Sequence, residues 1–427
     1  MPKTRSPLAI IFFTIFIDLV GFGIVIPVLP LYAERYGASE AVVGVLTAIY
    51  SVMQFMAAPV LGKWSDRVGR RPILMISLLG SSLGFFIMAL APRLPGGFGL
   101  FGMSSVLVWL FVARIIDGIS GGNISTAQAY IADVTTPESR SRGMGLIGAA
   151  FGLGFIFGPL IGGLMSNISA EAPFFFAGAM AAANATALFF FLPESLSAEH
   201  RGRATKRAGI NEIFRGSGDW HLKAVMATYF FATLAFAMMT VTYALFASER
   251  FHFDARHTGY VFAFVGTLGA VIQGGLLGRL VKIFGEKTLA VVGTAIFAAS
   301  LFALPMSATV AWLLIASTGI SIGNSLVTPT LNGLASKSVS PSAQGRILGV
   351  MSSVASLARI IGPLLGGFLL GRDARFQTVA PLRYGRTPYW TSGAIMLIAL
   401  VLSFAAHATE GSENKAQERA SMAGVEG

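Results

Sequence analysis

The chain has 427 residues, of which 54% are hydrophobic and only 12% are charged, with a net charge of +11 and no cysteine. A soluble domain carries about 25% charged residues, so this composition excludes a soluble protein and makes the lipid bilayer the solvent. The lack of cysteine excludes disulfides, thiolate metal sites and cysteine nucleophiles.

Apolar stretches long enough for a helix to cross a bilayer, about 20 residues each, recur along the chain. The first follows a short basic segment and reaches Pro30 without the cleavage site of a signal peptide, so we interpret it as a retained helix. Twelve windows qualify: 8–30, 41–61, 72–92, 103–124, 143–166, 173–192, 222–247, 257–279, 288–306, 309–330, 344–370 and 389–408. An even number places both termini on one side of the membrane.

The basic residues indicate which side that is. Most of the 31 lysines and arginines fall in segments on the same side as the termini, and cytoplasmic loops carry such an excess. We therefore predict a multi-pass protein of the bacterial inner (cytoplasmic) membrane with both termini in the cytoplasm. Clustering of the charge in short loops also argues against a nucleic-acid partner.

The longest polar interruption follows the sixth window and contains four basic residues close together, Arg201, Arg203, Lys206 and Arg207. It predicts a division into two halves. The predicted parts are an N-terminal six-helix bundle (1–192), a cytoplasmic linker (193–221), a C-terminal six-helix bundle (222–408) and a disordered cytoplasmic tail (409–427).

The two halves resemble each other in sequence. Gly158-Pro159-Leu160-Ile161-Gly162-Gly163 recurs as Gly362-Pro363-Leu364-Leu365-Gly366-Gly367, and Pro137, Arg142 and Gly145 recur at the same spacing as Pro341, Arg346 and Gly349. Six-helix halves in parallel repeat are typical of rocking transporters, with a substrate site near the membrane midplane. The repeat predicts an all-α membrane protein of 12 helices in two pseudo-symmetric six-helix bundles.

The loop between the second and third windows carries a family motif. Its sequence, Gly-Lys-Trp-Ser-Asp-Arg-Val-Gly-Arg-Arg-Pro over residues 62–72, resembles the G-x-x-x-D-R-x-G-R-R/K signature of the major facilitator superfamily. The resemblance implies the major facilitator fold and a cytoplasmic gate latch with Asp133 as partner. The residues of this latch would be Gly62, Asp66, Arg67, Gly69, Arg70, Arg71 and Asp133. Positive-inside topology alone would explain the arginines but not Asp66.

Further motifs narrow the resemblance to the 12-helix drug:proton antiporters. The motif residues Gly154, Gly158, Pro159, Gly162 and Gly163 resemble the antiporter motif, and Arg114-x-x-x-Gly118 resembles a second family motif. The segment 129–135 and Asp18 with its neighbouring glycines resemble the tetracycline-efflux branch. Tetracycline exporters are expected to carry an acid in helix nine, whereas 288–306 has none, which leaves the substrate open.

Four ionisable residues lie well inside the windows, away from their ends, where charge is costly and therefore indicates function. Asp18 is the candidate proton carrier, and Arg114 with Asp117, three residues apart on one helix face, completes the proton-coupling set. Two arrangements remain open. Arg114 either neutralises Asp117 alone or is shared between Asp117 and Asp18, and we favour the shared one. Arg359 either binds an anionic substrate group or satisfies carbonyls freed by Pro363.

Uncharged polar and soft apolar residues inside the windows are candidates for substrate contact, because methionine suits adaptable sites. Interhelical hydrogen bonding or apolar packing explains any one of them equally simply. The candidate substrate-binding residues are Tyr50, Gln54, Met238, Tyr243, Gln273, Asn324 and Arg359.

The predicted function is export of small amphipathic or drug-like molecules in exchange for protons, by a monomer that alternates access in the lipid membrane. The alternative is proton-coupled transport of one physiological solute, such as an organic anion or a glycolipid. An ATP-driven pump is disfavoured because no phosphate-binding G-x-x-x-x-G-K-[ST] loop is present. We expect no enzymatic activity, no cofactor and no metal.

Overall fold

The computed structural model describes residues 7–97, 99, 102–136, 139–196, 220–339, 344–375 and 383–423. Most of the linker predicted at 193–221 and residues 424–427 of the tail therefore lie outside the described residues. Within these ranges, eleven helices are long and apolar enough to cross a membrane. One of them, Ala255–Met306, is 52 residues long and contains Gly285 at φ 77° and ψ 157°, between the eighth and ninth predicted windows. The all-α membrane fold is confirmed.

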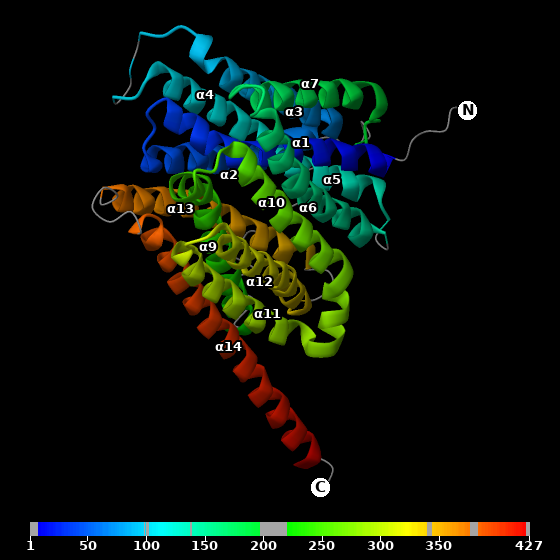
Figure 1. Ribbon diagram of the computed structural model, residues 1–427. Coiled ribbons are helices and arrows are strands. Elements are labelled where there is room, and N and C mark those ends of the chain that lie inside the picture. The colour runs from blue at the N-terminus through cyan, green and yellow to red at the C-terminus, as the bar shows by residue number, and fades with distance from the viewer. Residues whose placement is uncertain are drawn as a thin grey trace. The chain divides into compact units, whose positions relative to one another are not determined.

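The first six windows correspond to seven α-helices, because the helix that begins in the fourth window is interrupted and continues as a second helix. These helices are α1 (Pro7–Arg35), α2 (Glu40–Val68), α3 (Arg70–Leu90), α4 (Ser105–Ser120), α5 (Ile124–Val134), α6 (Arg140–Met165) and α7 (Ala172–Phe191), as Figure 1 shows. A short 3₁₀ turn, η2 (Gly121–Asn123), separates α4 from α5. Glycine lowers helix propensity, which explains a break at Gly121-Gly122.

The remaining helices are α9 (Trp220–Phe251), α10 (Ala255–Val271), α11 (Leu277–Ala303), α12 (Val310–Lys337), α13 (Gln344–Ala374) and α14 (Arg386–Ala423). A π-helical turn, η4 (Ile272–Leu276), joins α10 to α11. The helix α14 extends to Ala423, whereas the sequence predicts a disordered tail from residue 409. The tail is rich in Ala, Glu, Lys, Gln and Arg, which are strong helix formers even where no apolar face is buried.

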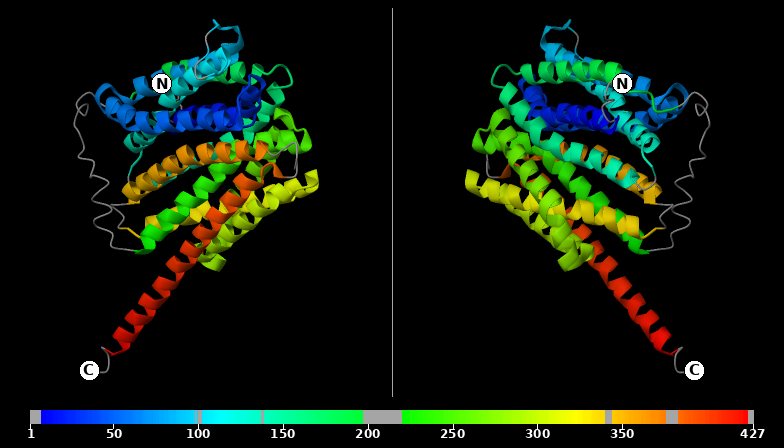
Figure 2. Two further views of the ribbon diagram at one scale, coloured as in Figure 1. Left: turned by 90° about the vertical axis from the view of Figure 1, so that its left-hand side faces the viewer. Right: turned by 90° about the vertical axis from the view of Figure 1, so that its right-hand side faces the viewer.

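The chain divides into two compact units. The first unit comprises Met1–Lys206, Met238–Thr267 and Pro363–Pro388, and the second comprises Arg207–Ala237, Leu268–Gly362 and Tyr389–Gly427. In the first unit α1 packs along α6 and α7, α3 packs along α4 and α7, and α2 packs along α4 (Figure 2). In the second unit α11 packs along α12. The six-helix bundles at 1–192 and 222–408 stay a prediction.

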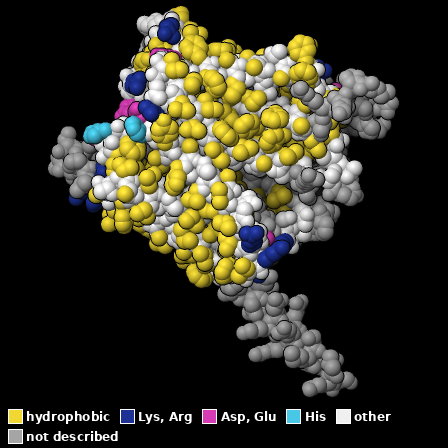
Figure 3. Space-filling model, turned by 45° about the vertical axis from the view of Figure 1, so that its right-hand side comes forward, with side chains coloured by type: hydrophobic (Ala, Val, Ile, Leu, Met, Phe, Trp, Pro, Cys, Tyr) yellow, Lys and Arg dark blue, Asp and Glu magenta, His cyan; other side chains and the backbone are white. Residues whose placement is uncertain are grey.

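Large apolar side chains are exposed on the helix surfaces, as expected where lipid replaces water. Val60 is 62% exposed, Phe190 is 72% exposed and Ile283 is 71% exposed. Hydrophobic side chains cover much of the face drawn in Figure 3, and the charged side chains appear toward its margins.

Glycines allow α1 and α6 to approach at backbone distance. A Cβ atom on Gly158 would lie 2.6 Å from the Cα atom of Gly23, and one on Gly154 would lie 2.8 Å from the Cβ atom of Leu19. On the neighbouring face of α6, a Cβ atom on Gly163 would lie 3.0 Å from the carbonyl oxygen of Ala255, at the start of α10. The predicted antiporter motif is thus a packing surface, typical of small residues between membrane helices.

We expect Gly158→Ala to destabilise the protein by about 1–3 kcal/mol, because the added methyl group forces two helix backbones apart. Gly152→Ala is the matched control, since a Cβ atom on Gly152 meets nothing within 4 Å. Thermal unfolding of both purified variants measures the difference. Equal unfolding temperatures would show that the α1–α6 contact does not need the glycine.

Candidate functional site

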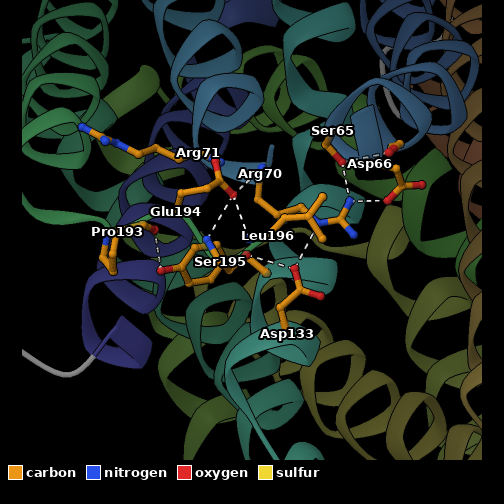
Figure 4. A network of polar contacts seen from close by, with 11 residues as sticks. Ser65, Asp66, Arg70, Arg71, Asp133, Pro193, Glu194, Ser195 and Leu196 are labelled. Carbon is orange, nitrogen blue, oxygen red and sulfur yellow. Dashed lines mark hydrogen bonds and ion pairs between the residues drawn. The ribbon is translucent and has the colours of Figure 1, made fainter. Parts of the chain in front are cut away.

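The family motif folds into an ionic cluster around a buried arginine at the junction of α2 and α3. Arg70, only 7% exposed, donates from Nη1 to Asp66 Oδ1 at 2.5 Å and from Nε to Asp133 Oδ2 at 3.2 Å (Figure 4). Its Nη1 also donates to Ser65 Oγ at 2.7 Å, and the Ser65 hydroxyl in turn donates to the Gly62 carbonyl. One guanidinium therefore holds the ends of α2 and α5 together.

Gly69 permits the sharp turn between α2 and α3. Its φ of 112° lies in the region that favours glycine. A Cβ atom there would also lie only 2.8 Å from the carboxyl carbon of Glu194. Both the backbone conformation and the close approach explain the glycine of the motif.

Glu194 and Ser195, which follow α7, join this cluster and were not predicted from the sequence. Glu194 accepts hydrogen bonds from the backbone N–H groups of Arg70 at 2.8 Å and Arg71 at 3.2 Å, which satisfies free donors at the N-terminus of α3 (Figure 4). Ser195 Oγ donates to Asp133 Oδ2 at 2.9 Å. The sequence did offer a signal for Glu194. It is an acidic residue just after an apolar window, on the side of the membrane where the sequence places most basic residues.

The side chains of the other two arginines of the predicted latch have different surroundings. Arg71 donates to the carbonyl oxygen of Phe189 and stacks over the Phe189 ring at 5.3 Å. Arg67 is exposed. The structure thus distinguishes Arg70, which lies between two carboxylates, from Arg71, which contacts Phe189, and from the exposed Arg67.

A second polar group lies inside the membrane-spanning part of the first unit. Arg114 donates to Asp117 at 2.8 Å, one turn along α4, and its guanidinium carbon lies 4.3 Å from the centre of the Tyr50 ring. Arg114 is 1% exposed and Asp117 is 4% exposed, so neither charge is solvated. The sequence spacing had left two arrangements open, and in this structure Arg114 pairs with Asp117.

Asp18 has a different partner. Asn123 Nδ2, from the 3₁₀ turn η2, donates to Asp18 Oδ2 at 3.3 Å. No ion pair of Asp18 is found among the described residues, so the favoured arrangement with Arg114 shared by both carboxylates is not the one that the structure adopts. The reason is geometric: Arg114 and Asp117 are neighbours on one helix, whereas Asp18 comes from α1.

The predicted substrate-binding residues fall in both units. In the first unit, Gln54 Nε2 donates to the Gly121 carbonyl at 2.9 Å and to the Tyr50 hydroxyl at 3.3 Å. In the same unit, Met238 is fully buried, and the Tyr243 ring lies 5.2 Å from the ring of Phe262. The hydrogen bond from Gln54 to Tyr50 thus joins two of the predicted substrate residues.

The second unit contains the other three predicted substrate residues. Gln273 is exposed and donates to Ser325 Oγ at 3.5 Å. Asn324 Oδ1 accepts from Thr328 Oγ1 at 3.3 Å, and Arg359 Nη2 donates to Ser356 Oγ at 3.1 Å, both within one helix. Substrate contact by all three stays a prediction.

A cavity of about 530 Å³ opens in the first unit, where the C-terminal end of α1 meets the segment between α9 and α10. Its lining residues are Val28, Leu31, Tyr32, Glu34, Arg35, Ser166, Ala170, Ser248, His252, Phe253, Asp254 and Ala255. None of the predicted substrate residues is among them.

Asp254, at the edge of this cavity, caps α10. Its Oδ1 accepts from the backbone N–H of His257 at 2.9 Å and contacts the ring Nδ1 of His257 at 2.7 Å. Burial raises the pKa of this carboxyl, but the hydrogen bonds from His257 outweigh burial and hold the pKa below its usual value. Asp254 is therefore a carboxylate at neutral pH.

Comparison with known proteins agrees with the motif and the fold. The family model of the Major Facilitator Superfamily matches residues 11–277 and 226–425 of this chain. The chain is 36% identical to the class E tetracycline resistance protein of Escherichia coli, over 83% of this chain and 85% of the relative. It is 30% identical to multidrug resistance protein 2 of Bacillus subtilis (strain 168), over 94% and 95% of the two chains.

A solved structure extends the comparison to the fold. The crystal structure of the human organic anion transporter MFSD10 (TETRAN) superposes with a TM-score of 0.66 at 25% identity, covering 94% of this chain and all of that one. The family model and the relatives match most of this chain in sequence, and the solved structure shares its all-helical architecture. This multi-pass membrane protein belongs to the major facilitator superfamily and is a transporter similar to the tetracycline-efflux proteins.

Proposed function

We propose that this transporter exports small amphipathic, drug-like molecules from the cytoplasm in exchange for protons, by alternating access across the inner membrane. The observation that carries the proposal is the state of Asp18. It lies in the apolar middle of α1, bonded to a neutral amide, while the nearby Arg114 is already paired with Asp117. A membrane-embedded carboxyl without a fixed cation can take up and release a proton at modest cost.

The relatives support the drug-like substrate class. They are tetracycline and multidrug resistance proteins by name, and they match most of this chain. Tyr50 and Gln54 supply an aromatic ring and an amide beside the Arg114–Asp117 pair, which suits an amphipathic ligand. Export, with both termini in the cytoplasm, also follows from the antiporter motif and the distribution of basic residues.

Purified protein in liposomes with an imposed pH gradient tests this function. Quenching of an internal pH-sensitive dye is recorded while tetracycline, ethidium or an organic anion is added in separate arms. We expect proton movement that depends on the added molecule in the tetracycline or ethidium arm. Proton movement in none of the arms would overturn proton-coupled export of this substrate class.

A second candidate is export of an organic anion. The similarity to the human organic anion transporter favours it, together with Arg359, a cationic side chain within α13. The organic-anion arm of the same assay separates the two candidates, because a response confined to that arm favours the second.

We further propose that the Arg70 cluster latches the cytoplasmic gate. We expect Arg70→Ala to lower transport at least about tenfold while equilibrium binding of substrate changes little, because removing the buried guanidinium releases α5 from α2 without altering Tyr50 or Gln54. Lys63→Ala removes one exposed positive charge from the end of the same helix and is the matched control.

Transport and binding are to be measured on the same preparation of each variant. If Lys63→Ala impairs transport as strongly as Arg70→Ala, positive charge at this loop matters and the latch does not. If binding falls in step with transport in Arg70→Ala, the cluster supports the substrate site and not the gate.

A further inference from the structure

The break in the fourth membrane helix is buried, although a break inside the membrane exposes backbone groups that need partners. Gly121, Gly122 and Asn123 form the 3₁₀ turn η2 between α4 and α5, and all three residues are buried, with Asn123 only 5% exposed. A short 3₁₀ segment inside a longer helix often marks a hinge. The partners of η2 show which elements such a hinge would connect.

On one side η2 is hydrogen-bonded to α1 through the side chain of Asn123. Asn123 Nδ2 donates to Asp18 Oδ2 at 3.3 Å. Asp18 is the proposed proton carrier, and Asn123 is the side chain that bonds it in the described part of the chain. The sequence alone had assigned Asn123 no role.

On the other side η2 lies directly against α2. The Gly121 carbonyl accepts from Gln54 Nε2 at 2.9 Å, and Gln54 in turn bonds the Tyr50 hydroxyl. A Cβ atom on Gly122 would lie 2.9 Å from the backbone nitrogen of Ala58, and one on Gly118 would lie 2.6 Å from the Tyr50 carbonyl oxygen. At Gly122 of η2, as at Gly118 of α4, the backbone lies directly against α2, so a displacement of η2 reaches α2.

From these contacts we infer that Asn123 is a positioning residue that couples the protonation of Asp18 to the Tyr50–Gln54 substrate wall through the 3₁₀ turn. This inference rests on the proposed proton exchange. An ionised carboxylate only accepts hydrogen bonds, whereas a protonated carboxyl also donates one. An amide can serve both states: its nitrogen donates to either form of the carboxyl group, and its oxygen accepts the O–H of the protonated form once the amide group rotates. That rotation moves a side chain anchored on η2, and η2 carries the carbonyl that holds Gln54.

The charged groups around Asp18 are few. Asp117 of α4 lies close enough to act on Asp18, and its charge is paired with Arg114. Between residues 143 and 191, which include most of α6 and all of α7, the only Asp, Glu, Lys or Arg in the sequence is Glu171. This residue directly precedes α7. Of the other helices against α1, α5 contributes Tyr130 and Asp133, and α2 contributes Tyr50 in the membrane part.

Asn184 provides a matched control for a purely structural role. Its Nδ2 donates to the Thr14 carbonyl at 3.0 Å, one turn before Asp18 on the same helix, and it is 4% exposed. Both asparagines are therefore buried amides that tie another helix to α1. Only Asn123 bonds the carboxyl.

The test measures how strongly pH changes the affinity for ethidium and, as a second probe, tetracycline, in purified full-length protein. One linked proton changes Kd up to about tenfold per pH unit, so we expect a parent ratio of about tenfold or more between pH 6 and pH 8. Asn123→Ala should reduce this ratio to about threefold or less, whereas Asn184→Ala should keep it. Asn123→Ser, too short to reach Asp18, should behave like Asn123→Ala and replaces it if the alanine variant does not fold.

The outcomes separate this inference from the proposed function. If Asp18→Asn abolishes the pH dependence but Asn123→Ala and Asn123→Ser keep it, the inference is overturned and proton exchange through Asp18 stands. If the parent affinity for both probes is independent of pH, or if neither probe binds, the proposed function fails and the inference fails with it. Adding Asn123→Ala to Asp18→Asn should cause no further change in the pH dependence, and an additional change would show that Asn123 acts elsewhere.

Discussion

Asp18→Asn is expected to abolish export driven by a pH gradient while substrate still binds. The variant resembles a permanently protonated carrier, because an amide has the shape of a neutral carboxyl group and cannot release a proton. Asp18 bonds Asn123 and no cation in the described structure, so the substitution strands no opposite charge and folding should be preserved. Concentrative export should fall about tenfold or more, and substrate-induced proton movement should disappear.

Proteoliposomes with an internal pH dye measure this effect, alongside equilibrium binding in detergent. Glu34→Gln is the control, because Glu34 is also a carboxylate of α1 but lies exposed near its end. If Asp18→Asn moves protons and exports substrate as the parent does, Asp18 has a structural role and proton coupling must use another group.

Arg114→Ala is expected to be the most damaging single substitution. It removes the cation that Asp117 contacts at 2.8 Å, and Asp117 is 4% exposed. Breaking one partner of a buried pair costs about 3–5 kcal/mol, because the remaining charge has neither water nor a counter-ion. The variant also loses the stacking on Tyr50, so the substrate wall should be disturbed as well.

Thermal unfolding and the yield of monodisperse protein measure the stability change. Replacing both partners, as Arg114→Leu with Asp117→Leu, should recover most of the stability but not transport, since no charge is then stranded. Lys337→Ala removes the exposed partner of a surface pair with Glu286 at 2.8 Å and should cost no more than about 1 kcal/mol. If Arg114→Ala is as stable as Lys337→Ala, the Arg114–Asp117 pair is not an essential buried contact.

Some features of the site could be predicted because one element contains them. Arg114 and Asp117 are three residues apart, and helix periodicity alone places them on one face. The motif residues Asp66 and Arg70 are likewise four apart across one tight turn, and they form the ion pair of the cluster. In both cases local geometry limits the possible partners to very few.

Other features could not be predicted, because they join residues distant in the sequence. Asn123 and Asp18 lie on different helices, and no spacing rule indicates which of several buried amides bonds the carboxyl. Glu194 reaches the N-terminus of α3 from the segment after α7, and the sequence analysis assigned it to the linker. The sequence left open whether Arg114 pairs with Asp117 alone or is also shared with Asp18, because the position of α1 relative to α4 is not a local property.

The sequence by itself determined the solvent, the membrane-spanning helices and the family of this protein. The bilayer constrains hydropathy and loop charge directly. Every membrane-spanning helix must be apolar over about 20 residues, whatever its packing partners, and cytoplasmic loops carry the excess of basic residues. Only the tertiary structure decided which polar groups meet inside the membrane and which glycines touch another backbone. Such contacts depend on the rotation and offset of one helix against another, and these are set by packing over the whole interface and not by any local pattern.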